Sequence, residues 1–166
     1  MITNEEINEW RATIREATFD ILREDGHVVS YAFFFSDTEP KHMVIELEGV
    51  NPLIHRSVIA TICTDHPVQA FMVVGDTHFV SSKNEDRDKV AKQISRAGGI
   101  KKHERATPCL MIVFESATTT RSTVYEYMRD EGGIVINTKP VLDVEPQNSL
   151  YAGILNQMPK MDLLIN

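Results

Sequence analysis

The sequence predicts an α+β fold: a single antiparallel or mixed sheet of about five to seven strands, with helices packed mainly on one face. Residues 108–115 give the first indication, because their central positions are all apolar, as in a strand covered on both faces. The order of predicted elements gives the second, since it lacks the strand-helix alternation of a doubly wound parallel sheet. With 166 residues, 42% of them hydrophobic, the chain can bury one sizeable core.

Residues 5–23 predict an amphipathic helix at the start of the chain. Asn4 is a candidate N-cap, and acidic residues occupy the first turn, where they complement the helix dipole. Asp25 and Gly26 end the helix. Its predicted buried stripe consists of Ile7, Trp10, Ile14, Ala17, Ile21 and Leu22.

A hairpin is predicted next, from two β-prone stretches at residues 28–35 and 43–48. The turn-rich segment between them contains Pro40, which favours a reversal of the chain. The second stretch alternates apolar and acidic residues. We therefore expect it to expose Glu46 and Glu48 to water.

A second helix is predicted to start at Asn51 and Pro52 and to run to about residue 65, where Pro67 follows. Residues 68–74 predict a buried strand. Gly75 and Asp76 predict a turn into a shorter strand at residues 77–81. The predicted stripe of the helix consists of Leu53, Ile54, Val58, Ile59 and Ile62.

The third helix is predicted to extend from an N-cap at Asn84 to Ala97, where two glycines stop it. Its apolar stripe is narrow, which is typical of a surface helix. The central hairpin follows, with strands at residues 108–115 and 123–129. A last strand is predicted at residues 134–137.

One domain is expected over residues 1–140, followed by a C-terminal arm at 141–166. Prolines interrupt this arm, which leaves one short helical candidate at residues 149–158. The arm carries too many apolar residues for a free polar extension, so we expect it to dock on its own domain or on a second copy. Exchange of terminal elements is a simple route to a symmetric dimer, which favours a homodimer.

Composition limits the classes of function. The net charge of −7 argues against general nucleic-acid binding, since phosphate affinity depends on clustered Lys and Arg. No apolar run approaches the roughly 20 residues that a membrane-spanning helix needs. The acidic N-terminus does not resemble a signal peptide, and two isolated cysteines are typical of a reducing compartment. We therefore expect a soluble cytoplasmic protein.

The segment 83–105 departs from this acidic average, because it holds eight basic and four acidic residues. If its cations converge, they would attract a small anionic ligand or an acidic protein surface. The alternative is a solvated helix and loop. The candidate anion-binding residues are Lys92, Arg96, Lys101, Lys102 and Arg105.

Cys63 and His66 are candidate metal ligands, because they are close enough in sequence to share an ion. His103 and Cys109 are further residues of zinc-binding type, but their spacing does not provide a second ligand pair. Both cysteines lie in apolar segments, which is typical of buried thiols. We therefore expect neither metal nor cofactor.

Catalysis is the alternative to binding. Asp76 and His78 stand two residues apart on a predicted strand and so share a face, which suits a carboxylate that orients an imidazole. Glu115 is a further candidate acid. The chain has no nucleophile elbow and no phosphate-binding loop. A turn Asp and an exposed His would explain the pair without catalysis.

Short motifs in the middle of the chain resemble a loose class of small bacterial and phage-encoded α+β proteins of unassigned function. The matching positions are Ala70 with Phe71, Arg105, and Arg129 with Asp130. The resemblance implies a sheet and a microbial or mobile-element source, and it brings no established chemistry. The expected function is therefore a binding or assembly protein that acts through oligomerisation and surface recognition, with a small hydrolase or transferase as the alternative.

Overall fold

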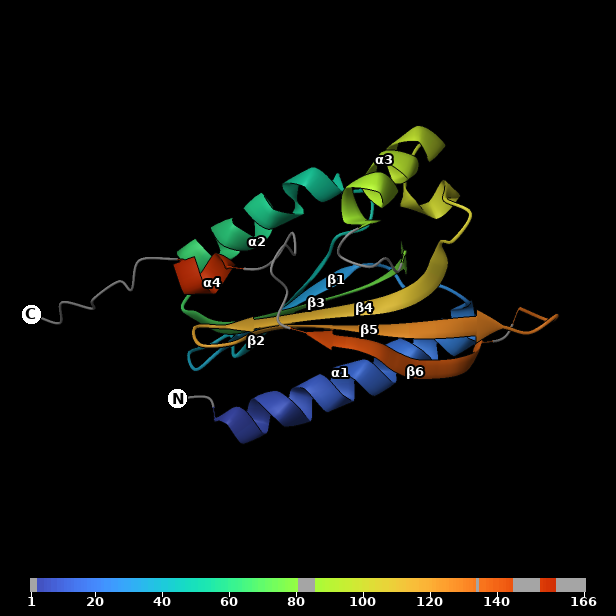
Figure 1. The fold of residues 1–166 in the computed structure, drawn as a ribbon. Helices are drawn as coiled ribbons and strands as arrows, with labels where there is room; N and C mark the ends of the chain where they lie inside the picture. Colours follow the sequence, from blue (N-terminus) through green and yellow to red (C-terminus); the bar gives the residue numbers. More distant parts are fainter. Residues whose placement is uncertain (1–2, 81–85, 134, 145–152, 158–166) are drawn as a thin grey trace, which may run out of the picture.

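The computed structural model describes residues 3–80, 86–133, 135–144 and 153–157, and it contains one antiparallel sheet between helical layers (Figure 1). The strand order is β2-β1-β3-β4-β5-β6, and every neighbouring pair is antiparallel. The predicted α+β fold with a single sheet is therefore confirmed. The elements are α1 (Asn4–Asp25), β1 (Tyr31–Ser36), β2 (His42–Glu46), α2 (Pro52–Asp65), β3 (Val68–Phe79), α3 (Arg87–Ala97), the 3-10 helix η2 (Ile100–Lys102), β4 (Thr107–Ser116), β5 (Thr120–Arg129), β6 (Val135–Val144) and α4 (Ile154–Gln157).

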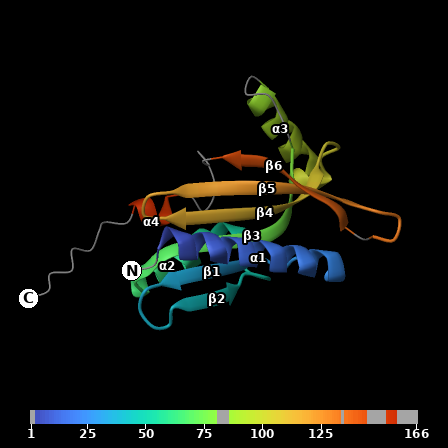
Figure 2. The same ribbon diagram turned by 90° about the horizontal axis from the view of Figure 1, so that it is seen from below.

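Helices cover both faces of the sheet, with α1 on one face and α2 with α4 on the other (Figures 1 and 2). Helices α2 and α4 therefore share one face, as expected for the helices in general, while α1 covers the opposite face. The reason is that β3 and β4 are apolar on both sides, so each side needs a layer above it. Under α1 the core contains Phe19, Leu22, Met72, Val74, Leu110 and Ile112. Under α2 and α4 it contains Phe34, Ile59, Phe71, Val73, Val113 and Ile154.

Helix α1 begins with a capping box, in which Thr3 and Glu6 each accept a hydrogen bond from the other's backbone amide. The N-cap is therefore Thr3 instead of the predicted Asn4. Part of the predicted stripe is also wrong, because Ala17 is exposed and Ile21 is 39% exposed. The buried contacts come from Thr18, Phe19 and Leu22, while Ile7, Trp10 and Ile14 are partly buried.

The hairpin of β1 and β2 is confirmed, and β2 exposes Glu46 and the following Glu48 as predicted. Strand β1 also pairs with β3, so β2 is left at the edge of the sheet. Helix α2 starts where Asn51 and Pro52 predicted it. Its buried side chains are His55, Ile59 and Cys63, whereas Ile54 is 49% exposed.

Strand β3 is a single long strand, so the turn predicted at Gly75 and Asp76 is wrong. Gly75 pairs with Met111 in the middle of the β3-β4 ladder. A Cβ at this position would lie 2.6 Å from the Ser30 Oγ atom. The glycine therefore permits close approach of a neighbouring segment, and it does not reverse the chain.

Strand β6 is longer than predicted and passes through Pro140, where the domain was expected to end. Proline lacks an amide donor, but an edge strand needs no donor on its outer side. Residues 141–144 therefore belong to the sheet. Of the predicted C-terminal arm, α4 docks on its own domain through Ile154, which is 4% exposed. The rest of the arm, at 145–152 and 158–166, lies outside the described residues.

Helix α3 lies at the end of the sheet away from α4 (Figure 1). Val90 is its buried side chain, and Gly98 caps it in a left-handed conformation, as predicted. The predicted N-cap Asn84 lies outside the described residues.

Candidate functional site

Helix α1 crosses its face of the sheet (Figure 2), and the residues on each side of it line an open groove. One groove lies between α1 and the β1-β2 hairpin, and we call it the apolar groove. The other lies between α1 and strands β4 and β5, and we call it the arginine groove. Their volumes are about 190 and 240 Å³ respectively, below the roughly 300 Å³ at which ligand pockets usually begin, so each can receive a side chain or a single anionic group.

The apolar groove is built from aromatic side chains of α1 and β1. The Trp10 ring stacks on Phe35 with centroids 4.8 Å apart, and the His42 ring meets Trp10 edge-on at 4.5 Å. Val44, on the outer strand, is 53% exposed. An aromatic floor beside an exposed valine is typical of a surface that buries apolar side chains of another segment.

The arginine groove takes a complete helical stripe from α1, since Asn8, Arg11, Ala12 and Arg15 recur at spacings of three and four residues. Its floor consists of Ile112, Thr123 and Tyr125 from the sheet. Ala12, between the two arginines in the stripe, adds only a methyl group to the lining. The groove therefore places two positive charges beside hydroxyl and amide groups, and the Arg15 guanidinium is also paired with the Glu16 carboxylate at 2.9 Å.

Contacts with the sheet position both arginines. The Arg11 guanidinium lies over the Phe114 ring at 5.0 Å from its centroid. Burial alone would lower the pKa of Arg15, but hydrogen bonds with Tyr125 and Glu16 outweigh it and raise the pKa above its ordinary value. The group therefore stays charged. Such pre-positioned guanidinium groups suit the paired oxygens of a carboxylate or phosphate.

The sequence contained a signal for this groove that our prediction missed. Arg11 and Arg15 are four residues apart, with Asn8 three residues before Arg11, so all three had to share one side of the predicted helix. Arginines on an amphipathic helix usually face water. Only the position of β5 beside α1 shows that these two line a groove.

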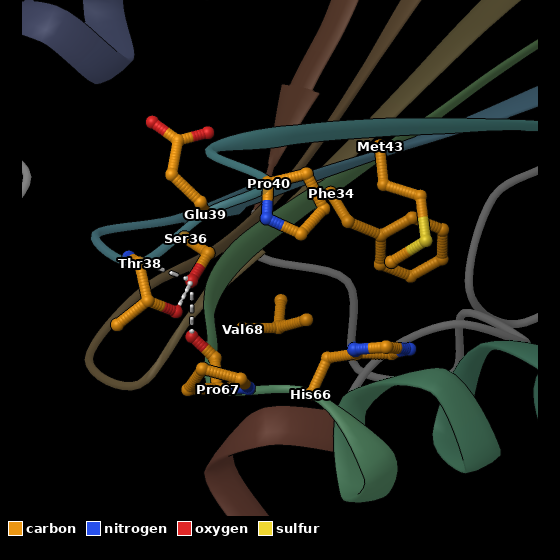
Figure 3. A pocket seen from close by; sticks show the side chains of 9 residues that line it. All are labelled: Phe34, Ser36, Thr38, Glu39, Pro40, Met43, His66, Pro67 and Val68. Carbon is orange, nitrogen blue, oxygen red and sulfur yellow. Dashed lines mark hydrogen bonds between the residues drawn. The ribbon is translucent and has the colours of Figure 1, made fainter.

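A third hollow lies between the β1-β2 turn and the end of α2 (Figure 3). The Ser36 hydroxyl is 3.0 Å from the Pro67 carbonyl oxygen, to which it donates, and it accepts a hydrogen bond from the Thr38 amide. His66 and Met43 close the hollow from the sides. Its volume is about 20 Å³, enough for one water molecule and too small for a substrate.

The predicted catalytic pair lies on the α1 face of β3. The Asp76 carboxylate accepts a hydrogen bond of 2.5 Å from the Tyr127 hydroxyl. Burial and this hydrogen bond to the charged carboxylate raise the pKa of Tyr127. Arg129 lies over the Tyr127 ring, 5.2 Å from its centroid. His78 follows two residues after Asp76 and pairs with Pro108 in the ladder.

Glu115, the third catalytic candidate, is not brought to this pair. It lies on the opposite face of the sheet, and its ladder position is five residues along β4 from Leu110, the partner of Asp76. The side chain is fully buried. Its carboxylate accepts hydrogen bonds from the amides of Gly153 and Leu155, the former at 2.6 Å. Glu115 therefore fastens α4 to the sheet.

The predicted anion-binding residues all lie on the solvent-exposed surface of α3 and the segment after it. Lys92 and Arg96 share one side of α3, and Lys101 and Lys102 belong to η2. The Lys102 side chain turns back towards Gly98 at the helix C-terminus, where a cation complements the dipole. With Arg105 these residues form an exposed basic surface, which we call the α3 basic surface.

The metal candidates are separated. Cys63 is buried under α2, whereas His66 is exposed at the helix end. Cys109 is buried six positions along β4 from Glu115, and His103 is buried beside η2, with its Nδ1 atom accepting from the Arg105 amide. Within the described ranges, no three His, Cys, Asp or Glu residues are grouped closely enough to hold a metal ion.

Comparison with known proteins gives no assignment: no family model, curated protein or solved structure matches the chain. Among the described helices, none has the length and apolar character needed to cross a membrane.

Proposed function

We propose that the protein is a soluble, cytoplasmic binding and assembly protein that forms a homodimer and recognises anionic groups on a partner or ligand. The observation that carries the proposal is the pair of open grooves on either side of α1. One groove offers apolar contacts and the other offers two fixed cations. Both are rigid features, because they are built on a helix and strands instead of loops.

Recognition is assigned to the arginine groove. Arg11 and Arg15 stand one helical turn apart, and Thr123 and Tyr125 supply hydroxyl groups on the facing wall. A carboxylate or phosphate group between them would replace bulk water with several charge-assisted hydrogen bonds. The α3 basic surface would add long-range attraction for an acidic protein without fixing the bound geometry.

Chemical-shift mapping on ¹⁵N-labelled protein tests this assignment, with inorganic phosphate and a short glutamate-rich peptide as probes. We expect the largest shifts at amides around Arg11, Arg15 and Tyr125. The double substitution Arg11→Ala/Arg15→Ala should weaken binding at least tenfold, because each charged hydrogen bond contributes about 1.5 to 3 kcal/mol.

The matched control is Lys92→Ala/Arg96→Ala, which removes the same charge from the α3 basic surface. It should leave the shifts around α1 in place. Equal loss of binding in both double variants would show that only net charge matters, and an unaffected Arg11→Ala/Arg15→Ala variant would remove the groove from the proposal.

The alternative is a small hydrolase or transferase that uses Asp76, His78 and a nearby acid. It is less well supported, because the Asp76 carboxylate binds Tyr127 and Glu115 lies on the other face of the sheet. Hydrolysis of p-nitrophenyl esters or phosphates would test this alternative. Activity in the wild type that is lost in Asp76→Asn and in His78→Ala would establish an enzyme and displace the binding proposal. A bacterial or phage source stays a prediction.

A further inference from the structure

The outer side of β2 presents backbone groups that no described strand pairs with. Two hydrogen bonds flank the hairpin: the Ser36 amide donates to the Lys41 carbonyl, and the Leu47 amide donates to the Ser30 carbonyl. They determine which residues of β2 have their backbone groups bonded to β1. Because hydrogen-bonded positions alternate along an antiparallel ladder, Met43 and Ile45 also bond to β1. The amides and carbonyls of the residues between them must therefore point outward. These residues are His42, Val44 and Glu46.

We propose that two copies of the chain pair through β2 in an antiparallel register centred on Val44, so that the two sheets become one. This inference rests on the assembly part of the proposed function and names its interface. A two-fold axis through the Val44 pair makes the contact isologous and closes it at a dimer. The outward groups would form about six backbone hydrogen bonds, two for each pair of facing residues.

The side chains of β2 complement themselves in this register. His42 of each copy faces Glu46 of the other, which sets an imidazole opposite a carboxylate that can accept its hydrogen bond, on both sides of the axis. Val44 faces Val44, which covers a side chain that is 53% exposed in the single chain. On the other face of the sheet, Met43 faces Ile45 of the second copy, so apolar groups meet there too.

Neighbouring registers lack this complementarity. Centring the axis on Ile45 would place Val44 against Glu46 of the second copy, and centring it on Met43 would place His42 against Val44. Either shift sets a polar side chain against the exposed valine. The side-chain pattern of β2 therefore selects the register centred on Val44.

Contacts in the apolar groove hold a side chain of β2 in place before pairing. His42 is held against the Trp10 ring at 4.5 Å, so less side-chain entropy is lost when Glu46 of the second copy reaches it. A two-fold axis perpendicular to the sheet places both α1 helices on the same face. The two apolar grooves would then meet over the Val44 pair and form one continuous trough.

Light scattering over a concentration series tests the interface. The wild-type chain should have twice the mass of 18.8 kDa, and Val44→Lys should be monomeric because it sets two like charges at the axis. The matched control is Ile54→Lys, since Ile54 is an equally exposed apolar residue at 49% on α2. It should remain dimeric, and circular dichroism should show that both variants are folded.

A charge-exchange cycle tests the register. His42→Glu places two acids opposite each other and Glu46→Lys places two bases together, so each should weaken dimerisation roughly tenfold. The double variant His42→Glu/Glu46→Lys places opposite charges across the axis and should recover most of the loss. Recovery requires that the two positions face each other, because a general effect of charge would not be reversed.

A cysteine at the axis gives a direct readout. Val44→Cys should form an intermolecular disulfide under mild oxidation, because facing Cα atoms in such a pair lie about 5.5 Å apart. The two native thiols are buried and should not interfere. Ile54→Cys is the control and should stay uncrosslinked.

The possible results separate this inference from the proposed function. A wild-type dimer that persists in Val44→Lys, with no Val44→Cys crosslink, would overturn the β2 interface and leave assembly intact. A wild-type chain that stays monomeric at about 100 µM would overturn both the β2 interface and assembly into a homodimer. This concentration is well above the micromolar dissociation constants of ordinary complexes. If β2 of a monomeric chain instead binds an extended peptide, the partner of this edge is a peptide strand, and the proposal of a second copy is overturned.

Discussion

Glu115 is fully buried beneath α4, with two backbone amides of the C-terminal segment pointing at its carboxylate. Asp76, on the other face, is bound by the Tyr127 hydroxyl. Both acids are candidates for catalysis from the sequence, because it shows that they are carboxylic acids but does not show which groups they bind. Their hydrogen bonds indicate that they hold distant segments together.

We expect Glu115→Ala to lower the free energy of unfolding by about 2 to 4 kcal/mol, because it leaves the half-buried amides of Gly153 and Leu155 without this acceptor. Urea denaturation measures this loss. Glu115→Gln keeps one acceptor oxygen and should lose about half as much. Equal stability of Glu115→Ala and wild type would show that α4 is not held by this carboxylate.

The two thiols predict how stability depends on pH. Burial, with a smaller contribution from Glu115, raises the pKa of Cys63 to about 12. Burial, with smaller contributions from Asp76 and Glu126, raises the pKa of Cys109 to about 12. Folding therefore favours the protonated thiols. Their contribution is complete below their ordinary pKa of about 9 and is lost as the pH rises towards 12.

The melting temperature should therefore fall between pH 8 and pH 10.5, and it should fall less steeply in the Cys63→Ala/Cys109→Ala variant. Differential scanning calorimetry at matched ionic strength gives both slopes. The comparison uses slopes because the alanines also leave small cavities that lower stability at every pH. Parallel slopes would mean that the thiols do not contribute.

Among the elements, β3 departs most from its prediction, since one strand replaces the two that a turn at Gly75 would separate. Gly75→Ala would bring a Cβ atom within 2.6 Å of the Ser30 Oγ atom. We expect a loss of about 1 to 3 kcal/mol in unfolding free energy, the range for overpacking.

The double variant Ser30→Ala/Gly75→Ala removes the clashing oxygen, so it should recover most of that loss relative to Ser30→Ala alone. Chemical denaturation of the four proteins completes the cycle. Additive losses in the double variant would show that Gly75 is required for a reason other than its contact with Ser30.

The C-terminal segment gives a second prediction at this scale. Truncation after Val144 removes α4, whose Ile154 packs into the core, and it uncovers Glu115. We expect the melting temperature to fall by roughly 6 °C or more, since about 3 kcal/mol is lost in a chain of this size. Truncation after Gln157 keeps α4 and should melt within about 2 °C of the full chain. A similar loss in both truncations would assign the effect to residues 158–166.

At the scale of the whole molecule, charge is unevenly distributed. The chain carries −7, while the α3 basic surface groups five cations at one end of the sheet. Long-range repulsion by the acidic remainder should prevent stable binding to a nucleic-acid backbone. We expect no binding of a fluorescent 20-base-pair duplex below about 10 µM protein at 150 mM salt, measured by anisotropy. Salt-dependent binding lost in Lys92→Ala/Arg96→Ala would make the α3 basic surface a nucleic-acid site.

The sequence by itself determined the elements whose signals are local. The apolar stretch of β4 predicted a central strand, Asn51 and Pro52 predicted the start of α2, and the β1-β2 hairpin followed from two β-prone stretches around Pro40. Each signal depends on residues a few positions apart. Backbone sterics, capping and alternation act over that range, so they can be read without knowing the fold.

Tertiary structure alone decided which residues meet. Pro140 is tolerated inside β6 because that strand is at the edge, and glycine suits position 75 of β3 because the Ser30 Oγ atom lies where a Cβ atom would approach. Arg11 and Arg15 line a groove only because β5 lies beside α1. Glu115 binds α4 because residues about 40 positions later return to it. Such contacts depend on strand order and helix placement, which the packing of the whole chain sets and local propensity does not encode.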